Sequence, residues 1–255
     1  MFRDHPVLGK VPPHFLWAGA AGAAVLLALL IGGRWLAGTW LGEVFIKGGP
    51  VMWPILLVSI LALAICLERG IALRQENVID QDFTAEVRRL STKGDLELAQ
   101  KICQDNQSSM ARILKAGLTR ASHGILEIER AIEAAGAREA AQMEANLRGL
   151  GVCANLAPLL GLLGTVTGMI NAFNVISQSG TGNPHLVASG IAEALITTAT
   201  GLIVGIPALA LYHYFRGRVD RFIFQMEEES LTFVEDLIKA MERFEQQQRR
   251  GAGEV

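Results

Sequence analysis

Long uncharged apolar stretches alternate with charged segments along this chain of 255 residues. Four stretches are long enough to cross a hydrocarbon core of about 30 Å, which takes about 20 residues of helix. They are residues 15–33, 48–67, a segment within 149–177, and 187–215. The pattern therefore predicts a membrane protein built from helices.

Lys and Arg residues near the ends of these stretches predict their orientation, because such residues are enriched on the cytoplasmic side. Arg69 follows the second stretch, Arg148 precedes the third and Arg216 follows the fourth, whereas the connection 178–187 holds no Lys or Arg. We expect segments 73–148 and 216–255 in the cytoplasm and the short loop 178–187 in the periplasm.

The N-terminal apolar segment, 1–40, has two interpretations. With Arg3 and Lys10 before it, the stretch 15–33 fits an extra transmembrane helix with its N-terminus inside. A basic start followed by an apolar core also fits a cleaved signal peptide. The stretch is longer than the apolar core of a typical signal peptide and no clear A-x-A site follows it, which favours the retained helix.

The charged segments carry apolar residues at helical spacing, so they are predicted to be helices that pack on neighbours. Ile125 and Ile128 begin one such pattern, which runs into the third stretch as a single helix, and Phe222 and Phe233 belong to another in the tail. The predicted fold is all-α, with three core transmembrane helices, an extra N-terminal transmembrane helix and long cytoplasmic helices. The predicted segments are core helix 1 at 48–72, the cytoplasmic helical region at 73–148, core helix 2 at 149–177, core helix 3 at 188–215, and the C-terminal helix and tail at 216–255.

Composition removes several function classes. Hydrophobic residues make up 51% of the chain and charged residues 19%, with a net charge of −2, so no basic excess indicates nucleic acid. The three cysteines lie far apart and the five histidines form no cluster. We therefore expect no metal, no cofactor and no enzyme activity.

Small and polar residues recur in the third stretch, "APLLGLLGTVTGMINAF". Small residues at this spacing let helix backbones approach closely in lipid. Polar residues within a span should face protein or water rather than lipid. The candidate packing residues are Gly161, Gly164 and Gly168, and the candidate polar residues are Thr165, Thr167, Asn171 and Asn174.

Glu193 lies in "GIAEALITTATGLIVGIPA", where no other charge occurs. A charge at this depth costs at least about 2.5 kcal/mol, so an intramembrane acid is a functional candidate by default. Thr197, Thr198 and Thr200 follow it on more than one side of the helix. A threonine in such a helix can instead simply bond the carbonyl one turn back, and both interpretations stay open.

The paired motifs "APLLGLLGTVTGMI" and "GIAEALITTATGLIVGIPA" resemble those of the MotA/TolQ/ExbB proton-channel family, and "GGPVMWPILLVSILALAICLER" resembles the first core helix of ExbB more than that of TolQ. The resemblance covers about residues 45 to 245. By position, it implies that Glu193 is the family's acidic residue and that Thr165 and Thr198 are its pore threonines, with Pro158 and Pro207 at matching prolines.

The resemblance also implies partners and a location. Family members form a ring, commonly a pentamer, in the bacterial inner membrane. The ring surrounds the single span of a smaller protein, ExbD in the ExbB case, which carries an aspartate. Ion flow drives motion that reaches a TonB-type energy transducer. A TolQ-like or MotA-like stator that drives envelope maintenance or motility is the alternative within the family.

Two other classes of function stay open on the residues alone. A secondary solute carrier is disfavoured because the chain has three or four spans and no inverted repeat. A membrane scaffold without ion conduction would use the same small and polar residues only to hold helices together.

Overall fold

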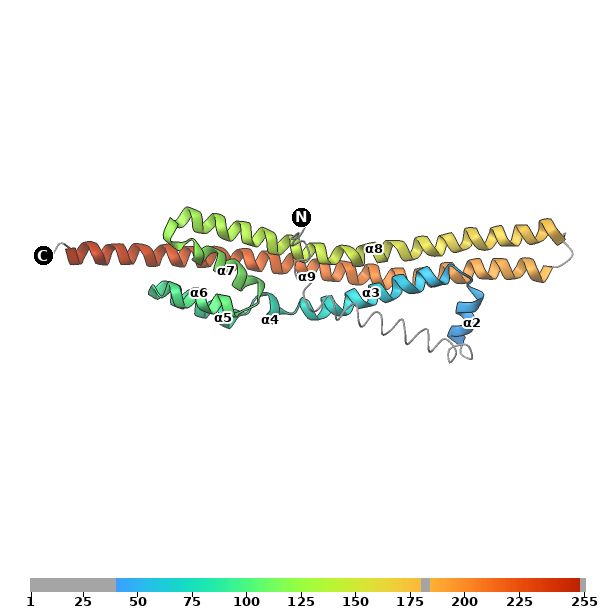
Figure 1. Ribbon diagram of the computed structural model, residues 1–255, viewed down its shortest axis with the longest axis horizontal. Coiled ribbons are helices and arrows are strands. Elements are labelled where there is room, and N and C mark those ends of the chain that lie inside the picture. Colours follow the sequence, from blue (N-terminus) through green and yellow to red (C-terminus); the bar gives the residue numbers. More distant parts are fainter. Residues whose placement is uncertain (1–39, 180–183, 253–255) are drawn as a thin grey trace, which may run out of the picture. The chain divides into compact units, whose positions relative to one another are not determined.

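The computed structural model describes residues 40–179 and 184–252 (Figure 1). This part of the chain consists of helices and connecting turns, with no β-strand, which confirms the predicted all-α class. The predicted N-terminal span, 15–33, lies outside the described residues, so the extra transmembrane helix stays a prediction. The helices are α2 (Trp40–Lys47), α3 (Met52–Ala72), α4 (Gln75–Val78), α5 (Gln81–Lys93), α6 (Leu96–Asp105), α7 (Ser109–Thr119), the 3-10 turn η1 (Ala121–His123), α8 (Ile125–Ser179) and α9 (Pro184–Ala252).

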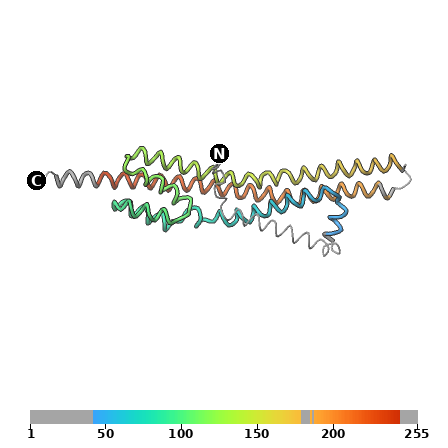
Figure 2. Tube along the Cα trace, viewed as in Figure 1, coloured from blue at the N-terminus to red at the C-terminus, as the bar shows by residue number. Residues whose placement is uncertain are grey.

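Two compact units divide the described residues. We call them the apolar unit, residues 40–69 with Leu147–His213, and the charged unit, Gly70–Asn146 with residues 214–252. Helices α8 and α9 each take part in both units, and α8 is continuous over its whole length (Figure 2). This continuity confirms the prediction that the charged helix runs directly into the third apolar stretch.

Within residues 40–179 and 184–252, three helices are long and apolar enough to cross a membrane, by length and composition. The qualifying segments are Met52–Ala72, Ile125–Gln178 and Val187–Arg243. In the apolar unit these helices expose large apolar side chains, as lipid-facing helices do. Examples on α3, α8 and α9 are Leu57, Leu61, Leu159, Leu162, Phe173, Leu195, Ile203 and Ile206.

The charged unit has a core of large side chains, as expected for helices with one apolar face. Its buried residues come from every long helix of the unit: Phe83, Val87, Leu90, Cys103, Ile113, Leu114, Ile128, Ile132, Phe222, Phe233 and Leu237. The apolar stripe of the tail, from Val219 to Leu237, is thus buried within its own chain. The sequence predicted the stripe but did not identify which helices cover it.

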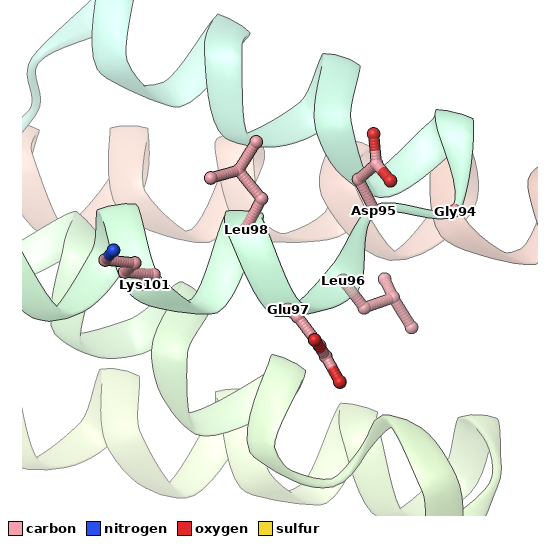
Figure 3. A pocket seen from close by; sticks show the side chains of 6 residues that line it. All are labelled: Gly94, Asp95, Leu96, Glu97, Leu98 and Lys101. Atoms are coloured by element: carbon pink, nitrogen blue, oxygen red, sulfur yellow. The ribbon is translucent and has the colours of Figure 1, made fainter.

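Short helices of the charged unit begin and end at capping residues. The side chains of Asp80 and Ser108 each accept a hydrogen bond, of 3.1 Å, from a backbone N–H three residues later. Helix α5 ends at Gly94, whose φ of 91° favours glycine. Figure 3 shows this turn, which lines a surface hollow together with Asp95, Leu96, Glu97, Leu98 and Lys101.

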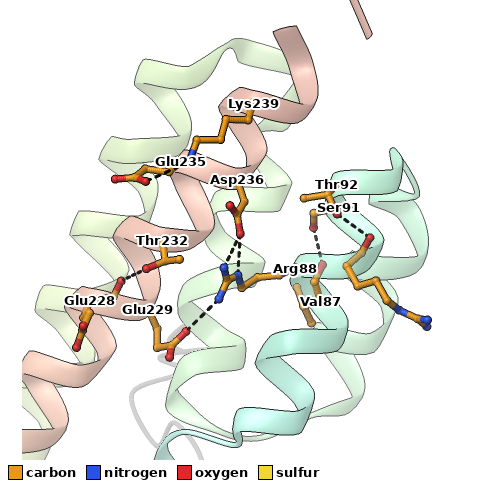
Figure 4. A network of polar contacts seen from close by, with 11 residues as sticks. Val87, Arg88, Ser91, Thr92, Glu228, Glu229, Thr232, Glu235, Asp236 and Lys239 are labelled. Carbon is orange, nitrogen blue, oxygen red and sulfur yellow. Dashed lines mark hydrogen bonds and ion pairs between the residues drawn. The ribbon is translucent and has the colours of Figure 1, made fainter. Parts of the chain in front are cut away.

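Two arginines connect helices of the charged unit that are distant in sequence. The Nε atom of Arg88 on α5 donates to Asp236 on α9 at 3.0 Å, and its guanidinium lies 3.8 Å from Glu229 (Figure 4). The Nε atom of Arg112 on α7 donates to Glu139 on α8 at 2.6 Å. The hydrogen bond to Glu139 raises the pKa of the Arg112 guanidinium above its usual value, although burial opposes the rise.

Candidate functional site

Helices α8 and α9 approach so closely in the apolar unit that their backbones are in contact. A Cβ atom on Gly161 would lie 3.1 Å from the carbonyl oxygen of Thr197, and one on Gly168 would lie 2.8 Å from that of Gly190. Both distances are shorter than ordinary van der Waals contact. The glycines therefore lie at the helix crossing, as small residues do where membrane helices pack tightly.

Gly164 receives the side chain of Thr197. A Cβ atom on Gly164 would overlap the Thr197 hydroxyl and lie 3.0 Å from its methyl group. Thr197 is 0% exposed, and its hydroxyl donates within α9 to the carbonyl oxygens of Ala194, at 2.9 Å, and Glu193, at 3.1 Å. Its methyl and hydroxyl thus fill the space that the missing side chain of Gly164 leaves.

The two prolines differ in their surroundings. Pro158, inside α8, packs on α9, since a Cβ atom on Gly205 would lie 2.5 Å from its Cγ. Pro158 has no N–H, so the carbonyl of Ala154 receives no helical hydrogen bond from it. That carbonyl oxygen faces the same glycine, at 3.3 Å from the constructed Cβ. Pro207 lies on the exposed face of α9.

The hydroxyl protons of Thr165 and Thr198 are both donated to backbone carbonyls. Thr165 donates to Leu162 at 2.6 Å. Thr198 donates across the helix crossing to Gly161 at 3.0 Å, and also to Ala194 of its own helix at 3.1 Å. A hydroxyl has one proton and two lone pairs, so in this state each oxygen can accept a further hydrogen bond but cannot donate one.

The remaining polar candidates fall into two groups. The hydroxyls of Thr167 and Thr200 bond carbonyls of their own helices, the alternative expected for any membrane threonine. Asn171 and Asn174 are exposed on the apolar unit. An exposed amide on an apolar helix requires protein or water beside it, so this face of α8 is unsuited to lipid.

Glu193 is half-buried and is the one charged residue within the apolar stretches 48–67, 149–177 and 187–212. Its carboxylate lies against Gly49, in the turn between α2 and α3, because a Cβ atom there would overlap Oε1 and lie 2.7 Å from Cδ. Among the side chains that the structure describes, no Lys, Arg or His forms an ion pair with this carboxylate. The neighbour of the Glu193 carboxylate is therefore a backbone turn and not a cationic side chain.

The contact with Gly49 was missed by the sequence analysis. The signal available was the pair of glycines before a proline, "KGGPV", which is typical of a turn. Nothing in the sequence relates this turn to Glu193, which lies far along the chain. No group of three or more His, Cys, Asp or Glu in the described segments could hold a metal ion.

Known proteins share the helices that make this site. Residues 105–228 match the model of the MotA/TolQ/ExbB proton channel family. The biopolymer transport protein ExbB-like 1 of Synechocystis sp. is 39% identical over 66% of this chain and 67% of its own length. The Tol-Pal system protein TolQ of Pseudomonas aeruginosa is 35% identical over 47% of this chain and 56% of its own.

The same fold occurs in a solved structure. A chain in the structure of C. jejuni MotAB matches with a TM-score of 0.53 and 17% sequence identity, and the match covers 88% of each chain. At this identity the likeness concerns the fold alone. The sequence matches, together with a lone carboxylate beside a glycine-lined helix crossing, establish that this chain belongs to the MotA/TolQ/ExbB proton channel family.

Proposed function

We propose that this protein is the ring-forming subunit of a proton-driven stator in the bacterial inner membrane. In this proposal Glu193 takes up and releases the transported proton. The main support is that Glu193 is the one charged residue within the apolar stretches 48–67, 149–177 and 187–212, half-buried and without a basic partner among the described residues. Such residues mark ion pathways in membrane proteins.

The hydroxyls of Thr165 and Thr198 can act along the proposed proton path as hydrogen-bond acceptors rather than donors. Thr165 and Thr198 have donated their protons to carbonyls and keep lone pairs. They are suited to accept from water, from hydronium or from a protonated carboxyl group. They are not suited to donate to a carboxylate, unless the carbonyl bonds break first.

A second titratable group must come from another chain. A single acid can bind and release a proton, but a directional device needs a group that meets it in some states and not in others. We propose a partner with one transmembrane span that carries an aspartate, enclosed by a pentameric ring of this protein. Each proton that crosses about 100 mV releases about 2.3 kcal/mol for work on the partner.

For the driven process we propose ExbB-like coupling to a TonB-like energy transducer, which powers transport across the outer membrane. The supporting observation is the ExbB-like name of a relative that is 39% identical. A TolQ-like role in envelope maintenance is the second candidate, supported by a TolQ that is 35% identical over a shorter segment. Restoration of one process and not the other, in cells that lack both native stators, separates the two.

Proton flux into liposomes tests the role of Glu193 directly. The protein is reconstituted with its co-expressed single-span partner, and a trapped pH-sensitive dye reports flux driven by a potassium diffusion potential. Glu193→Gln keeps the shape of the side chain and removes its charge, so flux should fall to the background while the ring still assembles.

Glu43→Gln is the matched control. Glu43 is an exposed acid on α2 that pairs with Lys47 at 3.3 Å, outside the apolar stretches. It should keep full flux. Full flux in Glu193→Gln, at normal expression, would exclude Glu193 from the path and favour the scaffold hypothesis.

Crosslinking tests the position of the partner. Cysteine is placed at Thr165 and at successive positions of the partner's span. Crosslinks near the partner's aspartate are expected if this span lies inside the ring. A cysteine at Leu159, an exposed aliphatic position of α8, is tested in the same way, and crosslinks confined to it would contradict the arrangement.

A further inference from the structure

We propose that Gly49 is a positioning residue that determines where the Glu193 carboxylate lies, an inference that rests on the role proposed above for Glu193. Gly49 belongs to the turn between α2 and α3. It touches the acid through its backbone, because it has no side chain of its own.

The turn holds Gly49 in a conformation that favours glycine. Its φ is +69°, in the left-handed region. Its N–H donates to the carbonyl of Ile46 at 3.4 Å, and its own carbonyl accepts from Met52 at 3.2 Å. Gly49 is therefore bonded to α2 on one side and to the first turn of α3 on the other.

The missing Cβ atom leaves the space that the carboxylate occupies. A Cβ on Gly49 would overlap Oε1 of Glu193 and lie 2.7 Å from Cδ and 3.3 Å from Cγ. The carboxylate is the free end of a flexible side chain. A side chain at position 49 would therefore displace the acid before it moved the helix backbone.

The same turn also contacts α9 at a second point, through Gly48, so its position beside the acid does not depend on the Gly49 contact alone. A Cβ on Gly48 would lie 2.5 Å from Cγ of Met52 and 3.3 Å from Cγ2 of Ile196. Ile196 and Glu193 are three residues apart and so lie on neighbouring positions of one helix face. The two glycines thus bring the turn onto α9 beside the acid.

Contact with a peptide backbone gives the charge a polar neighbour. Peptide dipoles in turns stabilise anions, whereas alkyl side chains do not. A side chain at position 49 would place alkyl carbon between the acid and this backbone.

Carbodiimide labelling measures the position of the acid independently of flux. Dicyclohexylcarbodiimide is apolar and adds to a carboxylic acid to form a stable N-acylurea, without a by-product. Mass spectrometry of the peptide that contains Glu193 gives the rate. In the reconstituted protein, Gly49→Ala should raise this rate several-fold, because the displaced carboxylate leaves the turn for the apolar side.

Gly49→Asn provides a second variant, since Asn tolerates the left-handed region while adding a Cβ atom. Both variants should lower proton flux at least about tenfold, because displacement of a reacting group by about 1 Å can cost up to about 100-fold. In a Glu193→Asp background the acid is shorter, so Gly49→Ala should change flux little further.

Two glycines are matched controls. Gly124 also has a positive φ, +95°, but a Cβ atom there would meet nothing within 4 Å. Gly48→Ala alters the same turn, where its Cβ atom would meet Met52 and Ile196 but not Glu193. Both variants should label at the wild-type rate.

An unchanged labelling rate in both Gly49 variants would overturn this inference, whatever happens to flux. A rate raised equally by Gly48→Ala would also overturn it, since general disturbance of the turn would then explain the effect. Full flux in Glu193→Gln would instead refute the proposed function, and the labelling rates would still decide where the acid lies.

Discussion

The two units of this protein bury opposite kinds of side chain. In the apolar unit the contact between α8 and α9 is made mainly of glycine, alanine and threonine, with Pro158, and many large aliphatic residues are exposed, although Ile55 and Leu150 are buried. In the charged unit the core holds phenylalanine, isoleucine, leucine and methionine, and the exposed surface carries the ion pairs. One pair of continuous helices therefore follows two packing rules along its length.

The surrounding solvent explains the difference. In water, burial of large apolar side chains is the main favourable contribution to folding. In lipid, a leucine is as well solvated outside the protein as inside it, so close contact between backbones and interhelical hydrogen bonds hold helices together. Removal of bulk should therefore destabilise the charged unit, and addition of bulk should destabilise the apolar unit.

The largest expected effect comes from loss of bulk in the charged unit. Phe233 on α9 is 1% exposed, so Phe233→Ala should cost about 3–5 kcal/mol of the unit's stability. Phe224, on the same helix, is 67% exposed, and Phe224→Ala should change stability by less than about 0.5 kcal/mol. Denaturation of the full chain in detergent, followed by proteolysis of segment 73–148, measures both. Equal effects would contradict the core assignment.

A smaller loss of stability should follow when one methyl group is added in the apolar unit. Gly164→Ala places a Cβ atom on the Thr197 side chain, an overpacking change that costs about 1–3 kcal/mol. Gly217→Ala is the control, because nothing lies within 4 Å of its Cβ position and alanine favours helix by up to about 1 kcal/mol. Thermal unfolding in detergent should show opposite signs for the two variants. A neutral Gly164→Ala would mean that the helix crossing can relax.

The smallest difference concerns one hydrogen bond. Thr198→Val removes the bond across the helix crossing to Gly161 and should weaken helix association by about 0.6 kcal/mol. Thr200→Val removes only a bond within α9 and should have no measurable effect. Comparison of the two single variants in the same unfolding assay gives the difference. Equal losses of stability in the two variants would mean that only the bond of Thr198 within α9 contributes.

Much of the fold could be predicted from the sequence because its signals are local. Uncharged length, helical periodicity and small-residue spacing identified the core spans and the glycines that lie where α8 and α9 cross. Capping residues such as Asp80 and Ser108 have local signals as well. Each of these features depends on residues within one or two helical turns of one another.

The surroundings of Glu193 could not be predicted, because they depend on contacts between distant segments. Its position in an apolar stretch indicated function, but the turn at Gly49 that contacts it is set by tertiary packing. The packing of the tail's apolar stripe is a second example. Periodicity predicted that Phe222 and Phe233 would be buried, but it did not show whether helices of the same chain or of another chain would cover them.

The buried Cys103 of α6 has a practical consequence for experiments with introduced cysteines. Burial raises the pKa of its thiol from 9.0 to about 11, against a smaller opposite effect of Lys115. The reactive species is the thiolate, whose fraction at neutral pH is then about 100-fold smaller than for an ordinary thiol. Maleimides and crosslinkers should therefore leave Cys103 unmodified while they react with an exposed cysteine, and this native residue can stay in place in labelling work.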